Sequence, residues 1–415
     1  MNKRLSKSVR FVVAILAIGA CTAAQSGTFS GIVPYTVPTS GSEPFGIAVG
    51  PDRALWFCEH QGNKIGRITT GGVFTEYPVP TPNSEPEDIT SGPDGALWFT
   101  EYAGNKVGRI TLAGSITEYP IPTPGSDSQA IITGSDGALW FVEAQGSGNG
   151  KIGRVTTSGV FTEYVLPTPY SQPSGLAIGS DGAIWFSEWN SGKMGRITTA
   201  GVITEYLLPT TNSQPLWVVA GPDGAIWFTQ QSGNSIGRIT TAGIVTEYPV
   251  PTAGSAPWNI TSSPDGALWF TELNSNKIAR ITTSGLITEY AVPASLGSPN
   301  GITAGSGVGA IWFTNREGDG IGKAPDCALG LSAIFAGNTL TTNFEVGIDV
   351  PADWSIVAGN TVLLAHKIPA VVPLRAVSLN WEPFPSGGGL VVKSSLTIHS
   401  GAVLCSEWTT VRTAP

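Results

Sequence analysis

The sequence predicts an all-β protein whose main part, residues 28 to 325, is a seven-bladed β-propeller of four-stranded blades. Three observations support this fold class. A Trp-Phe pair recurs at spacings of 42 to 45 residues, each copy divides into four short apolar runs, and no apolar period of 3.6 residues is visible. The tryptophans of the seven pairs are Trp56, Trp98, Trp140, Trp185, Trp227, Trp269 and Trp312.

The clearest copy of the repeat, residues 85 to 122, predicts the four strands of one blade. The predicted strands are residues 89–92, 96–101, 107–111 and 116–119. Asp94 and Gly95 form the first turn, because Gly adopts a positive φ in a tight hairpin without a Cβ clash. Side chains alternate along a strand, so Trp98 and Phe99 face opposite sides of the blade. Sheets that are apolar on both faces become stable only when neighbouring sheets stack against them.

The two ends of the repeat predict how the ring closes. A Thr-Glu-Tyr outer strand follows six of the seven Trp-Phe hairpins, while the hairpin around Trp312 ends at residues 321–323 without one. A partial copy of this strand, residues 33–38, precedes the first blade. We therefore expect the N-terminal strand to complete the last blade and remove the open sheet edge.

Residues 1 to 24 have the pattern of an export signal. Four basic residues begin the chain, and the apolar run Phe11–Ala20 is too short to span a membrane. The segment Ile18–Cys21 resembles a bacterial lipobox, in which Cys21 would be lipidated; ordinary cleavage near residues 23 and 24 would instead remove Cys21. Both alternatives predict an exported protein that is periplasmic, attached to the cell surface as a lipoprotein, or secreted.

The charge of the chain restricts its partners. Without the four basic residues of the signal, 18 Lys and Arg stand against 30 Asp and Glu, a net charge of −12. Such a protein is repelled by phosphate backbones and anionic lipids, so we expect no nucleic acid and no membrane contact beyond a lipid anchor. The expected partner is a small molecule, a glycan or an extracellular protein, and the expected state is a monomer.

Residues 326 to 415 lack the repeat and predict a separate domain. The alternating stretches 339–350 and 390–398 predict a small β-sandwich. Cys327 and Cys405 bracket this domain and could form a disulfide in an oxidising compartment. Cys58, inside the first blade, is predicted to be a buried and unreactive thiol.

A candidate site follows from two positions in each blade. The residues just before the first strand and the end of the second strand should meet at the top of the central channel. One interpretation is an acidic wall for a divalent cation or a cationic group, facing an aromatic wall for an apolar ring. The alternative is that the glutamates of the second strand only stabilise the top turns. The candidate ligand-binding residues are Glu43, Phe45, Glu59, Glu85, Glu101, Asp127, Glu143, Trp217, Trp258 and Asn300.

Histidine is scarce in the propeller, where His60 is the only one. We expect His60 to lie in a surface loop, and we keep it with Glu87 as a candidate catalytic residue. The sequence has no nucleophile next to a base, no phosphate-binding loop and no Cys/His zinc spacing.

The repeat also resembles a known family. The string E-P-x-x-I-x-x-G-x-D-G-A-L-W-F-T-E, followed by N-K-I-G-R-I-T-T and T-E-Y, is similar to the virginiamycin B lyase (streptogramin B lyase) family over residues 28 to 325. The resemblance implies a seven-bladed propeller and an elimination that opens the ester bond of a cyclic depsipeptide antibiotic. It also implies Mg²⁺ and a histidine that acts as general acid or base.

The functional positions of that family differ in this sequence. Its two histidine positions fall on Trp258 and Asn300, and its two glutamate positions on Ser298 and Asn315. Trp and Asn exchange no proton near neutral pH, and Ser with Asn cannot replace two carboxylates as Mg²⁺ ligands. In a register rotated around the ring, carboxylates of blades one and two match the glutamate positions and are candidate ligands for Mg²⁺ or Ca²⁺. These carboxylates are Glu43, Glu59, Glu85 and Glu101.

The sequence therefore favours a lyase-like propeller that binds a ligand, glycan or protein on its top face. The alternative is a metal-dependent carbon–oxygen lyase, or a hydrolase, that uses the carboxylates of blades one and two with Glu87 or His60 as base. A third hypothesis is a structural surface protein that docks through residues 326 to 415.

Overall fold

The computed structural model describes residues 32–144, 148–305 and 310–325, together with the strands between Ser332 and Val411. The predicted export signal with Cys21 lies outside the described residues. The predicted disulfide also lies outside them, because Cys327 is not described and nothing is described of the Cys405 side chain. None of the described residues belongs to an apolar helix of membrane-spanning length.

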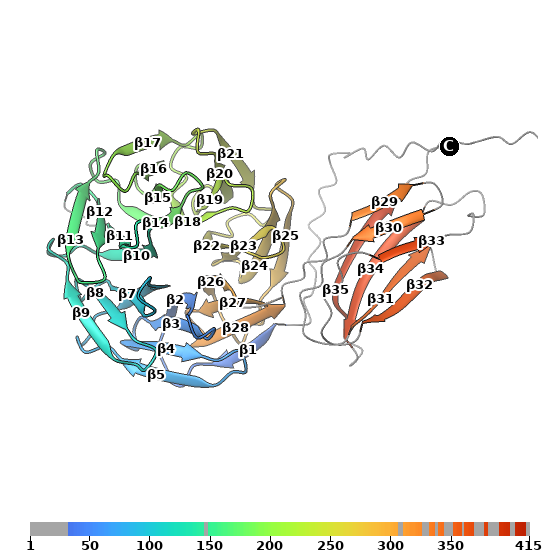
Figure 1. The fold of residues 1–415 in the computed structure, drawn as a ribbon, viewed down its shortest axis with the longest axis horizontal. Coiled ribbons are helices and arrows are strands. Elements are labelled where there is room, and N and C mark those ends of the chain that lie inside the picture. The colour runs from blue at the N-terminus through green and yellow to red at the C-terminus, as the bar shows by residue number, and fades with distance from the viewer. Residues whose placement is uncertain are drawn as a thin grey trace, which may run out of the picture. The chain divides into compact units, whose positions relative to one another are not determined.

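The propeller is a ring of seven four-stranded antiparallel blades (Figure 1). The first three blades are β2 (Pro44–Val49), β3 (Leu55–Glu59), β4 (Lys64–Ile68) and β5 (Phe74–Pro78); β6 (Pro86–Ser91), β7 (Leu97–Glu101), β8 (Lys106–Ile110) and β9 (Ile116–Pro120); and β10 (Ser128–Thr133), β11 (Leu139–Glu143), β12 (Lys151–Val155) and β13 (Phe161–Val165).

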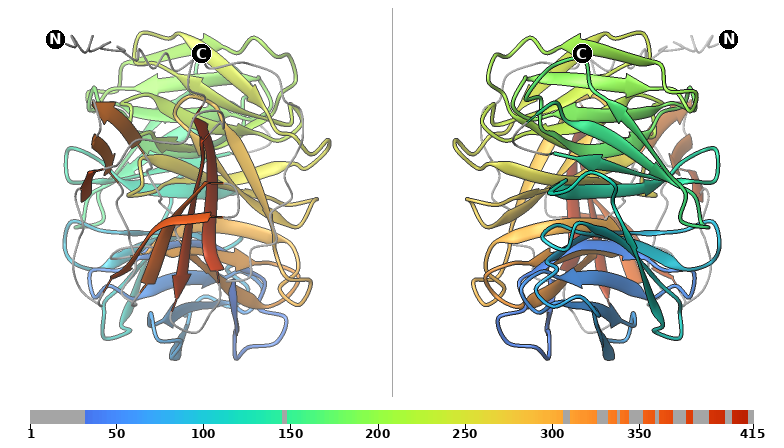
Figure 2. Two further views of the ribbon diagram at one scale, coloured as in Figure 1. Left: turned by 90° about the vertical axis from the view of Figure 1, so that its right-hand side faces the viewer. Right: turned by 90° about the vertical axis from the view of Figure 1, so that its left-hand side faces the viewer.

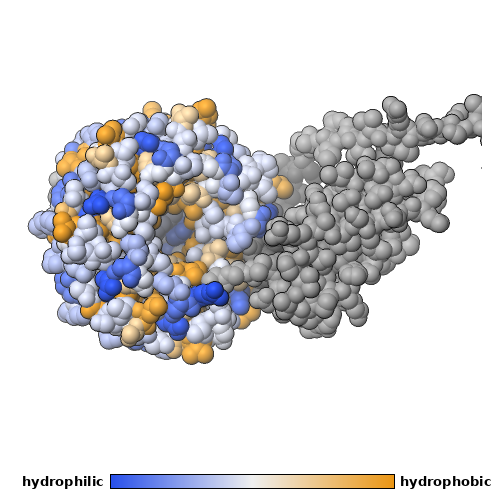
Figure 3. All heavy atoms as spheres, viewed as in Figure 1, coloured by the Kyte–Doolittle hydropathy of each residue, from blue (hydrophilic) through white to orange (hydrophobic). Residues whose placement is uncertain are grey.

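The next three blades repeat this order. They are β14 (Pro173–Ile178), β15 (Ile184–Glu188), β16 (Lys193–Ile197) and β17 (Ile203–Leu207); β18 (Pro215–Ala220), β19 (Ile226–Gln230), β20 (Ser235–Ile239) and β21 (Val245–Pro249); and β22 (Pro257–Ser262), β23 (Ala267–Glu272), β24 (Lys277–Thr282) and β25 (Ile287–Ala291). The innermost strands of successive blades lie side by side around the ring, including β26 and β2 where it closes. Loops gather on the two faces of the ring (Figure 2), and its centre is hollowed (Figure 3).

The seventh blade closes the ring as the sequence predicts. It consists of β26 (Pro299–Ala304), β27 (Ala310–Asn315), β28 (Gly320–Pro325) and the N-terminal strand β1 (Val33–Thr36). Tyr35 pairs with Ile321 across the two outer strands. Its ring stacks on Trp312 with centroids 5.6 Å apart, just as Tyr77 stacks on Trp56 in the first blade.

The core lies between the blades. All seven tryptophans of the repeat are buried, and so is the thiol of Cys58, as predicted. In β7, Trp98 packs in a cluster with Leu139 and Phe141 of the third blade, while Phe99 packs with Trp56 of the first blade. The predicted alternation along this strand is confirmed, and each second strand therefore joins its blade to both neighbours.

A glycine in the third strand allows this packing. A Cβ on Gly108 would lie 2.1 Å from the Cζ atom of Phe99, so the ring would have to shift to admit any other residue. The sixth blade has Ala279 at this position, opposite Phe270. The Gly of the K-I-G-R-I string is therefore explained by contact with a buried ring, not by turn formation.

The first strands differ from the prediction. The strand expected at residues 89–92 begins earlier, at Pro86, and its pairing with β7 is interrupted by a bulge between Pro86 and Ile89. The bulge occurs in the first strand of every blade. It inserts residues such as Glu87 and Asp88 next to the hub, which makes room for a site there.

The C-terminal part of the chain forms a separate compact unit. It contains the sheet β29 (Ser332–Ala336), β30 (Thr339–Asn343) and β33 (Val377–Asn380). It also contains the sheet β32 (Thr361–Ile368), β31 (Ala352–Ala358), β34 (Leu390–Ile398) and β35 (Val403–Val411). Two antiparallel sheets agree with the predicted small sandwich.

Candidate functional site

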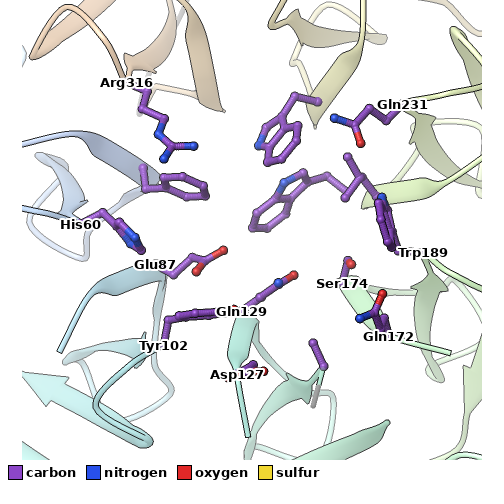
Figure 4. A pocket seen from close by; sticks show the side chains of 15 residues that line it. His60, Glu87, Tyr102, Asp127, Gln129, Gln172, Ser174, Trp189, Gln231 and Arg316 are labelled. Atoms are coloured by element: carbon purple, nitrogen blue, oxygen red, sulfur yellow. The ribbon is translucent and has the colours of Figure 1, made fainter. Parts of the chain in front are cut away.

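A pocket of about 500 Å³ opens at the hub of the ring, where seven blades contribute side chains (Figure 4). Its volume suits a small organic molecule. The lining residues are Phe45, His60, Glu87, Tyr102, Asp127, Gln129, Ala144, Gln172, Ser174, Trp189, Leu216, Trp217, Gln231, Trp258 and Arg316. Six of the predicted ligand-binding or catalytic residues are among them: Phe45, His60, Glu87, Asp127, Trp217 and Trp258.

The backbone just before the first strand of a blade fixes the positions of these side chains. Glu85, just before Pro86, has a positive φ of 52°. Its carbonyl accepts a hydrogen bond of 3.0 Å from the N–H of Tyr102, the residue that follows β7. Five further blades have a left-handed residue here: Glu43, Asp127, Gln172, Gln214 and Ala256. This conformation is unfavourable for residues other than Gly, and the repeated hydrogen bond to its carbonyl helps to hold it.

One side of the pocket is acidic. Glu87 is 8% exposed, and its carboxylate points into the pocket between His60 and Tyr102 (Figure 4). Burial raises the pKa of Glu87 to about 8, and the neighbouring carboxylates of Asp88, Glu85 and Asp127 raise it further than Arg316 lowers it. Glu87 is therefore largely protonated at neutral pH.

His60 lies in this pocket rather than in an exposed loop, so the expectation of a surface histidine is wrong. Its side chain is only 12% exposed, and its Nε2 atom lies 3.8 Å from Oε2 of Glu85. Its ring packs against Phe45 with centroids 5.4 Å apart. Burial lowers the pKa of His60, and the attraction of Glu85 offsets only part of that effect. The imidazole is therefore neutral above its ordinary pKa of 6.5.

The opposite side of the pocket is aromatic. Trp217 and Trp258 come from the fifth and sixth blades, which face the second blade across the ring. Trp258 also packs against the cluster that contains Phe45, and no described residue accepts a hydrogen bond from its buried Nε1 atom. Gln129, Gln172 and Gln231 add amides to the lining, and Ser174 adds a hydroxyl.

A single ion pair closes the rim between the last and first blades. Nε of Arg316 lies 3.0 Å from Oε2 of Glu43, and the guanidinium stands 5.7 Å from the centre of the Phe45 ring. Arg316 is the one arginine or lysine among the lining residues. Its charge is already partnered by Glu43, so it does not neutralise Glu87.

The glutamates that end the second strands point away from the pocket. Glu59, Glu101 and Glu143 are fully buried inside their blades and do not line it. Burial raises their pKa values to about 8, 8 and 7, and each is raised further by a glutamate of the outer strand, Glu76, Glu118 or Glu163. The prediction that the ends of the second strands meet at the central channel is therefore wrong for these glutamates.

The residues do not fit the metal that the resemblance implies. No three His, Cys, Asp or Glu side chains of the described residues are placed to hold a metal ion together. Of the four proposed ligands, Glu59 and Glu101 are buried inside blades, Glu43 pairs with Arg316, and Glu85 faces His60.

The residues at the positions where the resemblance implies functional side chains do not fit a metal site either. Asn315 is buried and its amide reaches the carbonyl of Gly320 at 3.4 Å. Asn300 is 1% exposed, does not line the pocket, and has two amide atoms without a partner among the described residues.

Except for His60 in the first blade, sequence reasoning missed the residues that follow the second strands. Tyr102, Trp189, Gln231 and Arg316 occupy this position and line the pocket. The sequence did contain a signal for this position, because side chains alternate along a strand. A residue next to a glutamate that is buried inside the blade must point to the opposite side, toward the pocket.

Comparisons with known proteins agree with the propeller fold. A family model described as "Virginiamycin B lyase family" matches residues 24–215 and 145–329. A solved virginiamycin B lyase from Staphylococcus aureus is 41% identical with a TM-score of 0.67, covering 70% of this chain and 98% of its own. A solved streptogramin B lyase is 38% identical with a TM-score of 0.67, covering 72% and 99%.

A third similar structure is a catalytically inactive variant of the Staphylococcus aureus enzyme with quinupristin. A histidine of that protein is replaced by alanine. It is 40% identical to this chain with a TM-score of 0.67, covering 70% of this chain and 98% of its own.

Proposed function

Since this chain belongs to the virginiamycin B lyase family, we propose that it is a binding member of that family. Its hub pocket holds a small organic molecule, and the family's elimination reaction is absent. We also propose that the protein works outside the cytoplasm, as its basic and apolar N-terminal segment indicates.

The composition of the pocket carries this proposal. Trp217 and Trp258 offer flat apolar faces, while the amides of Gln129, Gln172 and Gln231 offer donors and acceptors. Such a combination of aromatic walls and a few polar groups is typical of small-molecule sites. The lining suits recognition of a ligand that has an apolar ring and polar substituents.

The residues at the family's functional positions support the absence of the reaction. Trp258 and Asn300 stand where the family resemblance implies histidines, and neither can transfer a proton near neutral pH. In the similar Staphylococcus aureus protein, the variant without one histidine is catalytically inactive.

Turnover of a streptogramin B antibiotic tests the catalytic half of the proposal. Purified protein is incubated with quinupristin and MgCl₂, and the cyclic and ring-opened forms are separated by chromatography, with the Staphylococcus aureus enzyme as positive control. We expect no ring opening above the rate without protein. Ring opening that Glu87→Gln or His60→Ala abolishes would contradict the proposal in favour of a lyase that uses the first two blades.

Ligand-observed NMR tests the binding half. A panel of small molecules with one aromatic ring is screened by saturation transfer against the wild type and Trp258→Ala. We expect compounds that bind to the wild type and lose their signal with the variant, because an aromatic face contributes about 1 kcal/mol or more. A panel that gives no signal with the wild type would overturn the proposal.

A further inference from the structure

The acidic side of the pocket contains a carboxylic acid, Glu87, for which the described part of the chain supplies no partner. Only 8% of Glu87 is exposed, and its side chain points into the pocket (Figure 4). Within the described residues, its side chain takes part in no hydrogen bond or ion pair. Burying an ionisable group without a partner is unfavourable, so this arrangement is retained at a cost to stability.

The surroundings of Glu87 add negative charge instead of removing it. Asp127 also lines the pocket, and Tyr102 has its pKa raised by burial first and then by the charges of Asp127, Glu87 and Glu85. The nearest cation, Arg316, is partnered by Glu43 at 3.0 Å. Among the lining residues, therefore, no cation forms an ion pair with Glu87 or Asp127.

A cationic ligand would satisfy both sides of the pocket at once. An ammonium group next to Glu87 would favour its ionised form and make charge-assisted hydrogen bonds, which are about twice as strong as neutral ones. Aromatic faces attract cations as well as apolar rings. Trp217 and Trp258 stand on the side opposite to the carboxylates.

We propose that the ligand of the hub pocket is an organic ammonium compound with an apolar ring. The ammonium group lies against Glu87 and Asp127, and the ring packs on Trp217 and Trp258. This inference rests on the proposed function and adds the chemical class of the ligand.

Two matched probes test the charge preference. The dissociation constants of phenethylammonium and of its neutral analogue 2-phenylethanol are measured by ligand-observed NMR titration at pH 7.5 and low salt. We expect the cation to bind about tenfold more tightly or better, as a charge-assisted contact of about 1.5 kcal/mol or more implies. Equal affinities would overturn the inference and leave the proposed binding function intact, whereas no binding of either probe would count against both.

Glu87→Gln tests which residue supplies the preference. The substitution keeps the shape of the protonated side chain, and thermal melting checks that the variant folds. We expect the variant to lose most of the preference for the cation, because only Asp127 then remains beside the ammonium group. The exposed Glu317→Gln variant removes the same charge elsewhere and should keep the preference. A preference that persists in Glu87→Gln would overturn the assignment.

The pH dependence gives a second readout that needs no variant. A quaternary probe, trimethyl(phenethyl)ammonium, keeps its charge at every pH. Because Glu87 has a pKa of about 8, its ionised fraction grows between pH 6.5 and 9, and the affinity for the probe should rise severalfold over that range. The other groups that act on Glu87 are Asp88, with a pKa of about 7, together with Glu85, Asp127 and Arg316.

Glu87→Gln separates these contributions, because it should remove most of the rise with pH. An affinity of the quaternary probe that stays constant or falls between pH 6.5 and 9 in the wild type would contradict the inference.

Discussion

Asp94 holds the first hairpin of its blade together through two side chains. Its Oδ1 atom accepts a hydrogen bond of 3.1 Å from the indole Nε1 of Trp98, and its Oδ2 atom accepts one of 2.6 Å from Nε of Arg109. The sequence predicted a turn at this Asp-Gly pair. The two contacts explain why an acid stands there, because the fully buried indole needs an acceptor. Four other blades repeat the contact with Asp52, Asp136, Asp181 and Asp223.

Replacement of Asp94 tests this role. Asp94→Ala leaves the N–H of buried Trp98 without an acceptor, so we expect the free energy of unfolding to fall by about 1–3 kcal/mol. Asp94→Asn keeps an acceptor for the indole and loses only a partly exposed ion pair, which should cost less. Urea unfolding followed by tryptophan fluorescence measures both variants. Equal stability of Asp94→Ala and wild type would show that the hydrogen bond is unimportant.

At the scale of the strand, a buried glutamate ends the second strand in five blades. In β15, Glu188 accepts a hydrogen bond of 2.7 Å from Ser191 on one oxygen, while the other oxygen has no partner among the described residues. Burial raises its pKa to about 7, partly offset by Ser191, and the charge of Glu205 raises it again.

The fifth blade shows what this position favours. Gln230 replaces the glutamate, and its Nε2 atom donates a hydrogen bond of 2.9 Å to Oε1 of Glu247 in the outer strand. Its Oε1 atom accepts one of 2.7 Å from Ser235, which stands where the first four blades and the sixth have lysine. An amide has nearly the shape of a protonated carboxyl group but needs no proton. We infer that Glu188 is protonated near neutral pH and takes the place of this amide beside Glu205.

The stability of the propeller should therefore depend on pH. The folded-state pKa of Glu188, about 7, is above its ordinary value of 4.5, so the folded state binds the proton more tightly. The free energy of unfolding must then fall as pH rises from about 5 to 8. Glu205, whose pKa is lowered by hydrogen bonds from Lys193 and Thr168 against the effect of burial, stays ionised in this range.

Glu188→Gln should reduce this loss of stability with pH. We expect the variant to exceed wild type by roughly 1–3 kcal/mol at pH 8 and to differ little at pH 5. Urea unfolding at pH 5, 6, 7 and 8 measures the effect, with Glu317→Gln as the exposed control. A variant that is no more stable than wild type at pH 8 would contradict the protonated state.

At the scale of the whole molecule, the ring was predictable and the pocket only in part. Seven copies of one repeat predicted the blades, their packing and the closure by residues 33–38, because each depends on side chains that recur. The pocket depends on residues that differ between blades. Placing them requires the bulge near Glu87 and the left-handed residue before it, which no local pattern announces. His60 was misplaced although the alternation along β3, which buries Glu59 inside the blade, turns the next residue toward the pocket.

The seven blades thus combine a uniform framework with a varied hub. Glu118 in the outer strand accepts hydrogen bonds from Thr81 and Lys106, and such contacts recur around the ring. They bind the outer strand of a blade to the loop that precedes the blade. The hub instead gathers carboxylates in one part and tryptophans in another. Tryptophans and phenylalanines of the second strands join neighbouring blades, so many hub positions are free to differ.

The proposed function and the inferred ligand class both depend on a ligand that occupies the hub pocket between its acidic side and its aromatic side. A crystal structure of the protein soaked with phenethylammonium tests that claim most directly. We expect the probe in the pocket, with its nitrogen about 2.7–3.2 Å from a carboxylate oxygen of Glu87 and its ring against Trp217 or Trp258. A pocket that stays empty while the probe binds elsewhere, or a probe whose nitrogen points away from Glu87, would contradict it.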